Sequence, residues 1–121
     1  MKVILDTNFL VYCAKQKIHY KEGIQNLVRE QYDLVTVSNV VEELEKLTQT
    51  SKKYADKQAA ELALKLLKAN EVKIIKSPGR YADDAIINAS NKAIVATLDI
   101  GLIKYLEKAI IIRGKKKLVF K

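Results

Sequence analysis

Short apolar segments alternate with longer amphipathic segments along the whole chain. Five of the apolar segments are rich in Val and Ile and do not alternate with polar residues, which is typical of strands covered on both faces. These segments are Lys2–Leu5, Asp33–Val37, Val72–Ile75, Ala93–Thr97 and Ala109–Ile112. The pattern therefore predicts an α/β fold with a parallel sheet of about five strands.

The segments between these strands have the periodicity of amphipathic helices. They are Asn8–Lys15, Glu22–Glu30, Ser38–Thr48, Lys53–Lys68, Asp83–Asn91 and Gly101–Glu107. In the fourth helix an apolar stripe recurs at helical spacing, formed by Ala55, Ala59, Leu62, Ala63 and Leu66. The third and fourth helices follow each other without a strand between them, so the pattern predicts a helical hairpin that could cover a site.

Length and composition indicate one globular domain, residues 1–121. With 49% hydrophobic and 30% charged residues, the chain is too apolar to be disordered and has no apolar stretch long enough to span a bilayer. Met1 is followed directly by a strand segment, without the features of a secretory signal. We therefore expect a cytoplasmic protein that has no membrane partner.

The single cysteine, Cys13, and the single histidine, His19, exclude an internal disulfide and a Cys/His zinc site. Any metal must therefore be held by oxygen ligands. The chain has 22 Lys and Arg against 14 Asp and Glu, which gives a formal net charge of +8. Such an excess favours a polyanionic partner, and nucleic acid is the first candidate.

Acidic residues follow each of the first four predicted strands. Asp6 comes directly after the first strand, Asp99 follows the fourth, and the helix after the third opens with Asp83 and Asp84. The helix after the second strand contains Glu42, Glu43 and Glu45. Because ligands of open parallel sheets bind beyond the carboxyl ends of the strands, these carboxylates could converge at one edge of the sheet.

Each of these acids, taken alone, could be a helix cap or a first-turn acid that interacts with the helix dipole. Capping does not explain why every strand end in this part of the chain carries one. Carboxylates gathered in one place repel each other unless some are protonated or a cation lies between them. An all-oxygen cluster favours Mg²⁺ or Mn²⁺, and in a basic protein it indicates hydrolysis of a phosphodiester bond by metal-activated water.

Helical periodicity narrows the choice of ligands only in part. The third helix buries the face that carries Val40, Val41, Leu44 and Leu47. Glu42 points away from that face, whereas Glu43 and Glu45 flank it and both stay eligible. Asp83 lies closer to the margin of the core than Asp84, but spacing alone does not choose between them.

Four motifs of the chain resemble those of the PIN-domain ribonucleases. They are Val3–Asn8, Val40–Leu44, Tyr81–Ile87 and Ala96–Asp99, which occur in the family's order and span nearly the whole chain. The resemblance implies a PIN-like doubly wound parallel sheet flanked by helices, with the helical hairpin over one edge, and metal-dependent cleavage of RNA. VapC-type toxins and ribosome-processing PIN nucleases are the similar subgroups, which implies an antitoxin or an RNA-processing partner and a homodimer.

The family motifs also imply which residues form the site. The catalytic and metal-binding acids that they select are Asp6, Glu43, Asp84 and Asp99. Asn8 and Thr97 resemble polar residues that orient ligands in the family, and Asp83 is a supporting residue that makes a double acid with Asp84. The implied cofactor is Mg²⁺ or Mn²⁺, and the implied substrate is RNA.

Two other classes of function are alternatives. Phosphatases of the haloacid-dehalogenase type also place an aspartate after the first strand, but they need a second one two residues later, where this chain has Asn8. Receiver domains need an acidic pair after the first strand, where only Asp6 stands. A non-catalytic module that binds RNA or docks a partner is the third hypothesis, and RNA binding without cleavage would distinguish it.

Overall fold

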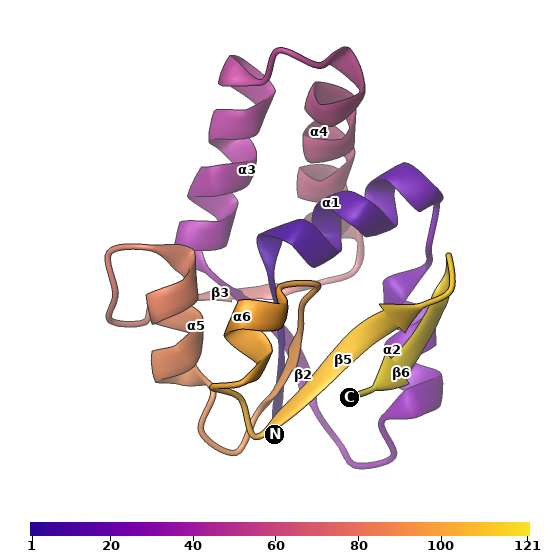
Figure 1. The fold of residues 1–121 in the computed structure, drawn as a ribbon, viewed down its shortest axis with the longest axis vertical. Helices are drawn as coiled ribbons and strands as arrows, with labels where there is room; N and C mark the ends of the chain where they lie inside the picture. The colour runs from indigo at the N-terminus through magenta and orange to yellow at the C-terminus, as the bar shows by residue number, and fades with distance from the viewer.

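The computed structural model describes all residues, 1–121, and alternates strands with helices (Figure 1). In chain order the elements are β1 (Lys2–Leu5), α1 (Thr7–Gln16), α2 (Tyr20–Leu27), β2 (Asp33–Val37), α3 (Ser38–Thr50), α4 (Tyr54–Ala69), β3 (Lys73–Ile75), α5 (Ala82–Ala89), β4 (Ile94–Ala96), α6 (Ile100–Ile103), β5 (Lys108–Arg113) and β6 (Lys117–Phe120). None of the helices combines the length and the apolar character that crossing a bilayer requires.

The strands form one six-stranded sheet in the order β3-β2-β1-β4-β5-β6. Strands β1 to β5 are parallel, and they confirm the five predicted strands with ends that differ by at most one residue. Strand β6 is an addition that pairs antiparallel with β5. The hydrophobic pattern does not predict β6, because a four-residue segment directly after a run of lysines carries too little periodicity.

The strand order reverses between β1 and β4. The chain adds β2 and β3 on one side of β1 and then crosses to the other side to add β4 and β5. Leu5 pairs with Ala96, so the carboxyl ends of β1 and β4 lie next to each other. This is the doubly wound arrangement that the family resemblance implies, and such a reversal opens a crevice where ligands bind.

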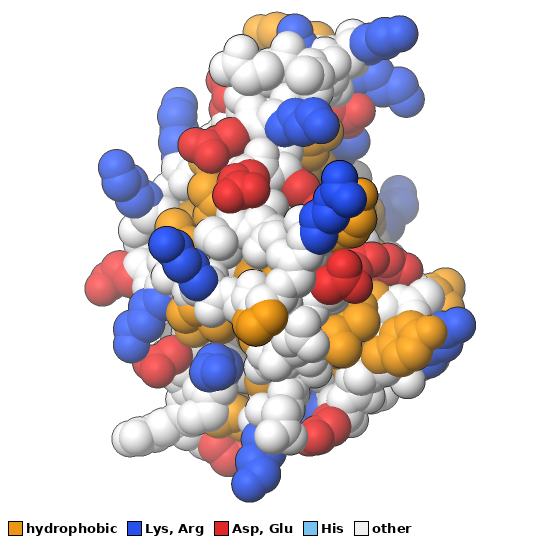
Figure 2. Space-filling view, turned by 90° about the vertical axis from the view of Figure 1, so that its left-hand side faces the viewer, with side chains coloured by type: hydrophobic (Ala, Val, Ile, Leu, Met, Phe, Trp, Pro, Cys, Tyr) orange, Lys and Arg blue, Asp and Glu red, His pale blue; other side chains and the backbone are white.

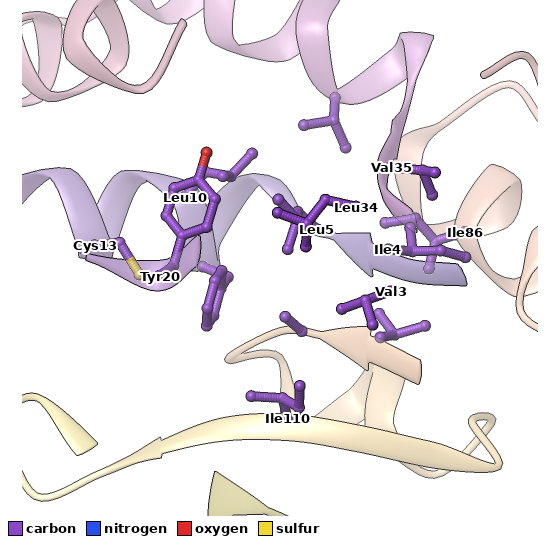
Figure 3. Packing of buried hydrophobic residues seen from close by; sticks show 14 of the residues in the cluster. Val3, Ile4, Leu5, Leu10, Cys13, Tyr20, Leu34, Val35, Ile86 and Ile110 are labelled. Atoms are coloured by element: carbon purple, nitrogen blue, oxygen red, sulfur yellow. The ribbon is translucent and has the colours of Figure 1, made fainter. Parts of the chain in front are cut away.

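Apolar side chains on both faces of the sheet form one core of 29 buried residues. Figure 3 shows Val3 and Leu5 of β1 at its centre, between Tyr20 on one side and Ile86 on the other. Cys13 belongs to this core, and burial raises the pKa of its thiol to about 12. The thiol is therefore protonated and packs as a small apolar group.

Helices α3 and α4 pack side by side as the predicted hairpin, which projects beyond the sheet, and α1 packs against α4 (Figure 1). The buried residues of α4 are Ala59, Ala60, Ala63 and Leu67. The predicted stripe is thus only partly correct, since Leu62 is 40% exposed and Ala55 is exposed. Because α4 contacts two helices, it buries small residues on two neighbouring faces instead of one stripe.

The turn before α5 is held by one side chain of α3, Asn39, and by the backbone of α5. Nδ2 of Asn39 donates hydrogen bonds to the carbonyl oxygens of Gly79 (3.2 Å) and Arg80 (3.3 Å). Oγ of Ser77 donates to the carbonyl oxygen of Ala85 at 2.7 Å. Gly79 has a φ of +147°, and a Cβ there would lie 2.5 Å from the backbone nitrogen of Ala85. This turn therefore fixes where α5 begins.

We expect Gly79→Ala to destabilise the protein by about 2 kcal/mol or more, because both the backbone conformation and the close approach of α5 exclude a side chain. Gly114 offers a matched control, since its φ is +65° but no atom lies within 4 Å of a Cβ built there. Gly114→Ala should cost about 1 kcal/mol. Urea denaturation compares the two variants, and equal losses of stability would contradict the packing argument.

Candidate active site

Asp6 places a buried carboxyl group at the reversal of strand order. It caps the N-terminus of α1 and is 3% exposed. Its Oδ1 accepts a hydrogen bond from the backbone nitrogen of Thr7 (2.8 Å), and its Oδ2 accepts one from Oγ1 of Thr97 (2.6 Å). Burial is the main cause that raises the pKa of Asp6 to about 6; the charges of Asp83 and Glu43 act in the same direction, and the two hydrogen bonds oppose them.

Polar contacts join the ends of β1 and β4. Thr97 is completely buried, and its Oγ1 accepts a hydrogen bond from the backbone nitrogen of Asp99 at 3.1 Å. Oδ1 of Asn8 accepts a hydrogen bond from the backbone nitrogen of Leu98 at 3.1 Å. The Thr97 hydroxyl therefore accepts a hydrogen bond from Asp99 and donates one to Asp6. The bond to Asp6 fixes the orientation of the Asp6 carboxyl group.

Asp99 combines a capping role with a position near the site. Its Oδ1 accepts hydrogen bonds from the backbone nitrogens of Gly101 (2.9 Å) and Leu102 (3.3 Å) at the start of α6. The cap occupies one carboxylate oxygen and leaves Oδ2 outside these contacts. After burial, the charge of Asp99 is the largest cause that raises the pKa of Asp83, so the Asp99 carboxylate lies within electrostatic reach of Asp83.

Among the glutamates of α3, Glu43 faces the site. Its Oε1 accepts a hydrogen bond from Oγ1 of Thr7 at 2.5 Å, which links α3 to the first turn of α1. Glu43 lines a pocket with Asp6, whereas Glu42 and Glu45 do not. Helical periodicity left Glu43 and Glu45 equally eligible, and the approach of α3 to α1 distinguishes them.

On α5, Asp83 lines the same pocket and Asp84 does not. Burial raises the pKa of Asp83, and the charges of Asp99 and Asp84 add to this effect. Cβ of Asp84 instead lies beside the turn, 2.8 Å from the position that a Cβ on Gly79 would take. The motif-based choice of Asp84 stays a prediction, while the geometry favours Asp83.

The pocket has a volume of about 390 Å³ and opens to solvent. It is lined by Asp6, Thr7, Asn8, Val11, Lys15, Glu43, Leu47, Asp56 and Asp83. Lys15 and Asp56 form an ion pair that joins α1 to α4. Neither the strand-end rule nor the family motifs indicate Thr7, Lys15 or Asp56 as site residues. Thr7 could have been found from its place beside Asp6, but nothing local indicates a pair whose members lie on different helices.

No three Asp, Glu, His or Cys side chains lie close enough together to bind one metal ion directly. The assignment of Asp6, Glu43, Asp84 and Asp99 as the metal-binding acids stays a prediction. Asp6, Glu43 and Asp83 line the pocket, whereas Asp99 does not line it and acts on Asp83 through its charge. Glu43 is held by the hydroxyl of Thr7, and Asp99 is held by the backbone nitrogen of Gly101. Mg²⁺ keeps several water ligands and commonly binds only one or two carboxylates, so this donor set fits a hydrated ion.

The surface around the pocket is mixed in character. Figure 2 shows acidic side chains gathered below the α3–α4 hairpin, exposed hydrophobic side chains beneath them, and Lys and Arg side chains nearby. Large exposed hydrophobic residues at the starts of α5 and α6 include Tyr81 (60% exposed) and Ile100 (83% exposed). The guanidinium of Arg80 lies over the ring of Tyr81, 5.3 Å from its centroid. The start of α5 therefore carries an exposed aromatic ring, two positions before Asp83 in the chain, and a cation that lies over it.

Comparison with known proteins identifies the family. Residues 3–115 match a family described as a PIN like domain. The chain belongs to this PIN-like family. It is 35% identical over 101 residues to ribonuclease VapC4 of Methanocaldococcus jannaschii, a match that covers 81% of this chain and 76% of that protein. The resemblance drawn from the four motifs is therefore confirmed.

Solved structures of PIN-domain proteins share the fold. The PIN domain endonuclease Utp24 is similar with a TM-score of 0.75 and 26% identity, covering 97% of this chain and 90% of that chain. VapBC2 from Rickettsia felis, solved with a DNA fragment from its promoter, gives a TM-score of 0.61 at 18% identity, covering 88% and 96%. VapBC-1 from nontypeable Haemophilus influenzae gives 0.58 at 16%, covering 87% and 92%. At these lower identities, the two VapBC structures show likeness in fold alone.

We expect Asp6→Asn to stabilise the metal-free PIN domain at about pH 7. The pKa of folded Asp6, about 6, exceeds the ordinary value of 3.8, so the native state binds the proton more tightly than the unfolded chain. Stability therefore falls as pH rises between these two values. A shift of this size corresponds to about 3 kcal/mol, and the amide should recover part of it because it keeps a hydrogen-bond acceptor.

Urea denaturation in EDTA at about pH 4 and about pH 7 measures this effect. The gain of the Asp6→Asn variant should be present at the higher pH and largely absent at the lower one. Glu61→Gln removes an exposed carboxylate of α4 and serves as the control, with an expected change within about 0.5 kcal/mol. A loss of stability that is equal at both pH values would contradict the account of a buried charge.

Proposed function

We propose that this PIN domain is a divalent-metal-dependent endoribonuclease that hydrolyses phosphodiester bonds of RNA. The observation that carries the proposal is the buried Asp6 carboxyl group at the strand reversal, which shares one pocket with Glu43 and Asp83. The net charge of +8 supports a polyanionic substrate. Homology to a ribonuclease at 35% identity supports RNA as that substrate.

Asp6, Glu43 and Asp83 are the residues that would hold the ion, with Asp99 beside them, and Mg²⁺ or Mn²⁺ suits their oxygen donors. When bound, such an ion lowers the pKa of a coordinated water and neutralises charge that develops on the phosphate. The pKa of Asp6, about 6, lies below neutral pH, so at about pH 7 most of the Asp6 carboxyl groups are already deprotonated.

The other residues of the pocket position these carboxylates. Thr97 and the backbone nitrogen of Thr7 direct both oxygens of Asp6, so the group is oriented before any ligand arrives. The hydroxyl of Thr7 holds Glu43, which couples α1 to α3. Lys15 lines the pocket and places a cation where a substrate phosphate would enter, although Asp56 shares its charge.

The biological setting follows from the relatives and is also a proposal. Ribonuclease VapC4 and the PIN domain endonuclease Utp24 are similar to this chain, and the VapBC complexes share its fold. We infer a cytoplasmic enzyme that forms a homodimer and works either as a toxin restrained by an antitoxin or with an RNA-processing partner. A non-catalytic module that binds RNA or docks a partner is the alternative.

We expect purified protein to cleave RNA in Mg²⁺ or Mn²⁺ and to lose this activity in EDTA. Asp6→Asn, Glu43→Gln and Asp99→Asn should each lower the cleavage rate about 100-fold or more, because each removes charge from the ion's surroundings. Gel analysis of structured and unstructured RNAs measures the products, and Glu61→Gln is the control. RNA binding without cleavage in every metal condition would favour the non-catalytic alternative, and full activity in EDTA would refute metal chemistry.

The two aspartates of α5 can be separated by mutation. We expect Asp83→Asn to reduce cleavage about 100-fold and Asp84→Asn to reduce it less than about 10-fold, because Asp83 alone lines the pocket. The measurement is the single-turnover rate at saturating metal for both variants. The opposite order would favour the motif-based choice of Asp84 as the residue near the ion.

A further inference from the structure

The turn between β5 and β6 concentrates positive charge. We call Arg113–Lys117 the basic turn; it contains Arg113, Lys115, Lys116 and Lys117 around Gly114, and all five residues are exposed. The three ion pairs of the chain involve none of these residues. The four cations are therefore free to bind an anion.

The topology of the sheet brings the basic turn to the side of the sheet where the carboxyl ends of the parallel strands lie, which is also the side of the pocket. Strand β5 is parallel to β4, which is parallel to β1. The carboxyl end of β5, where the basic turn starts, therefore points in the same direction as the strand ends that carry Asp6 and Thr97. Figure 1 shows the turn between β5 and β6 beneath the C-terminal end of α1.

Tyr12 fixes the basic turn against α1. Its hydroxyl donates a hydrogen bond to the carbonyl oxygen of Lys115 at 2.9 Å, so the anchor uses only the backbone of the turn and leaves the lysine side chains unengaged. Tyr12 lies one helical turn beyond Asn8, on the same face of α1, and Asn8 lines the pocket. At the rise of an α-helix, Tyr12 is roughly 9 Å along the axis from Asp6.

We propose that the basic turn binds phosphates of the RNA strand whose scissile bond lies in the pocket, with the strand running along α1. This inference rests on the proposed function and extends it to the path of the substrate. The turn has no large apolar side chain, and lysines are depleted in protein interfaces, which disfavours a protein partner. Lysine ammonium groups are point charges on flexible stems, which suits successive phosphates of a strand without sequence preference.

The test is RNA binding in EDTA, which prevents cleavage, with a labelled single-stranded oligonucleotide and fluorescence anisotropy at several salt concentrations. The variant is Lys115→Gln with Lys116→Gln. The matched control is Lys2→Gln with Lys121→Gln, which removes the same charge. These two lysines are exposed and lie at the other end of the strands, where β1 begins and β6 ends.

We expect the variant of the basic turn to bind RNA about 10-fold more weakly at about 0.15 M salt, and the control to change less than about 2-fold. The slope of log affinity against log salt should fall by about 0.7 for each lost phosphate contact, hence about 1.4 for two. Equal weakening of the two variants would assign the effect to net charge and overturn the proposal. Competition by polyglutamate as strong as that by RNA of equal charge would also overturn it, in favour of an acidic protein segment.

A cleavage assay in Mg²⁺ separates this inference from the proposed function. The variant of the basic turn should raise KM for a long RNA about 10-fold and leave kcat within about 2-fold, because the lysines bind substrate away from the reacting bond. A loss of kcat alone would place these lysines in the chemistry and overturn their role as a binding site. If the wild-type protein binds RNA with the expected dependence on the lysines of the basic turn but does not cut it, the nuclease proposal fails and with it the scissile bond in the pocket, while the binding of RNA phosphates by the basic turn stands.

Discussion

The candidate site depends on one hydrogen bond, which the hydroxyl of Thr97 donates to the buried carboxyl group of Asp6. The two residues are 91 positions apart in the chain and become neighbours only because β1 pairs with β4 at the reversal of strand order. A carboxyl group buried to this degree is costly for the fold, and its raised pKa expresses that cost. The surrounding structure must keep this group oriented, and Thr97 and the first backbone nitrogen of α1 do so.

Most of the scaffold follows from the hydrophobic pattern. A strand such as β1 is recognisable because Val3, Ile4 and Leu5 are all completely buried, so its sequence is continuously apolar. The hydrophobic pattern does not predict elements whose structure depends on contacts with distant parts of the chain. Strand β6 forms because the free side of β5 supplies hydrogen-bonding partners. The buried face of α4 is set by its contacts with two neighbouring helices, and the periodicity of the α4 sequence does not reveal where those helices lie.

The site is predictable to the extent that each residue follows a strand end. Asp6 and Asp99 could be proposed from that rule alone, whereas the choice between Glu43 and Glu45 required the hydrogen bond from Thr7. The α5 helix gives the sharpest contrast, because the family motif selects Asp84 and the geometry favours Asp83. Which aspartate faces the pocket depends on the orientation of α5 about its axis, and the turn that leads into α5 is held by Asn39 of α3. This contact joins residues 40 positions apart, so the local sequence around α5 does not predict it.

The two edges of the sheet restrict how this domain can assemble. Strand β3 has only three residues, begins at Lys73 and is followed by Lys76, while β6 begins at Lys117 and is followed by Lys121. Short strands bordered by lysine resist the addition of a foreign strand, since charge repulsion accompanies any pairing of like edges. Assembly of this domain by continuing its sheet into a second subunit is therefore disfavoured at both of these strands.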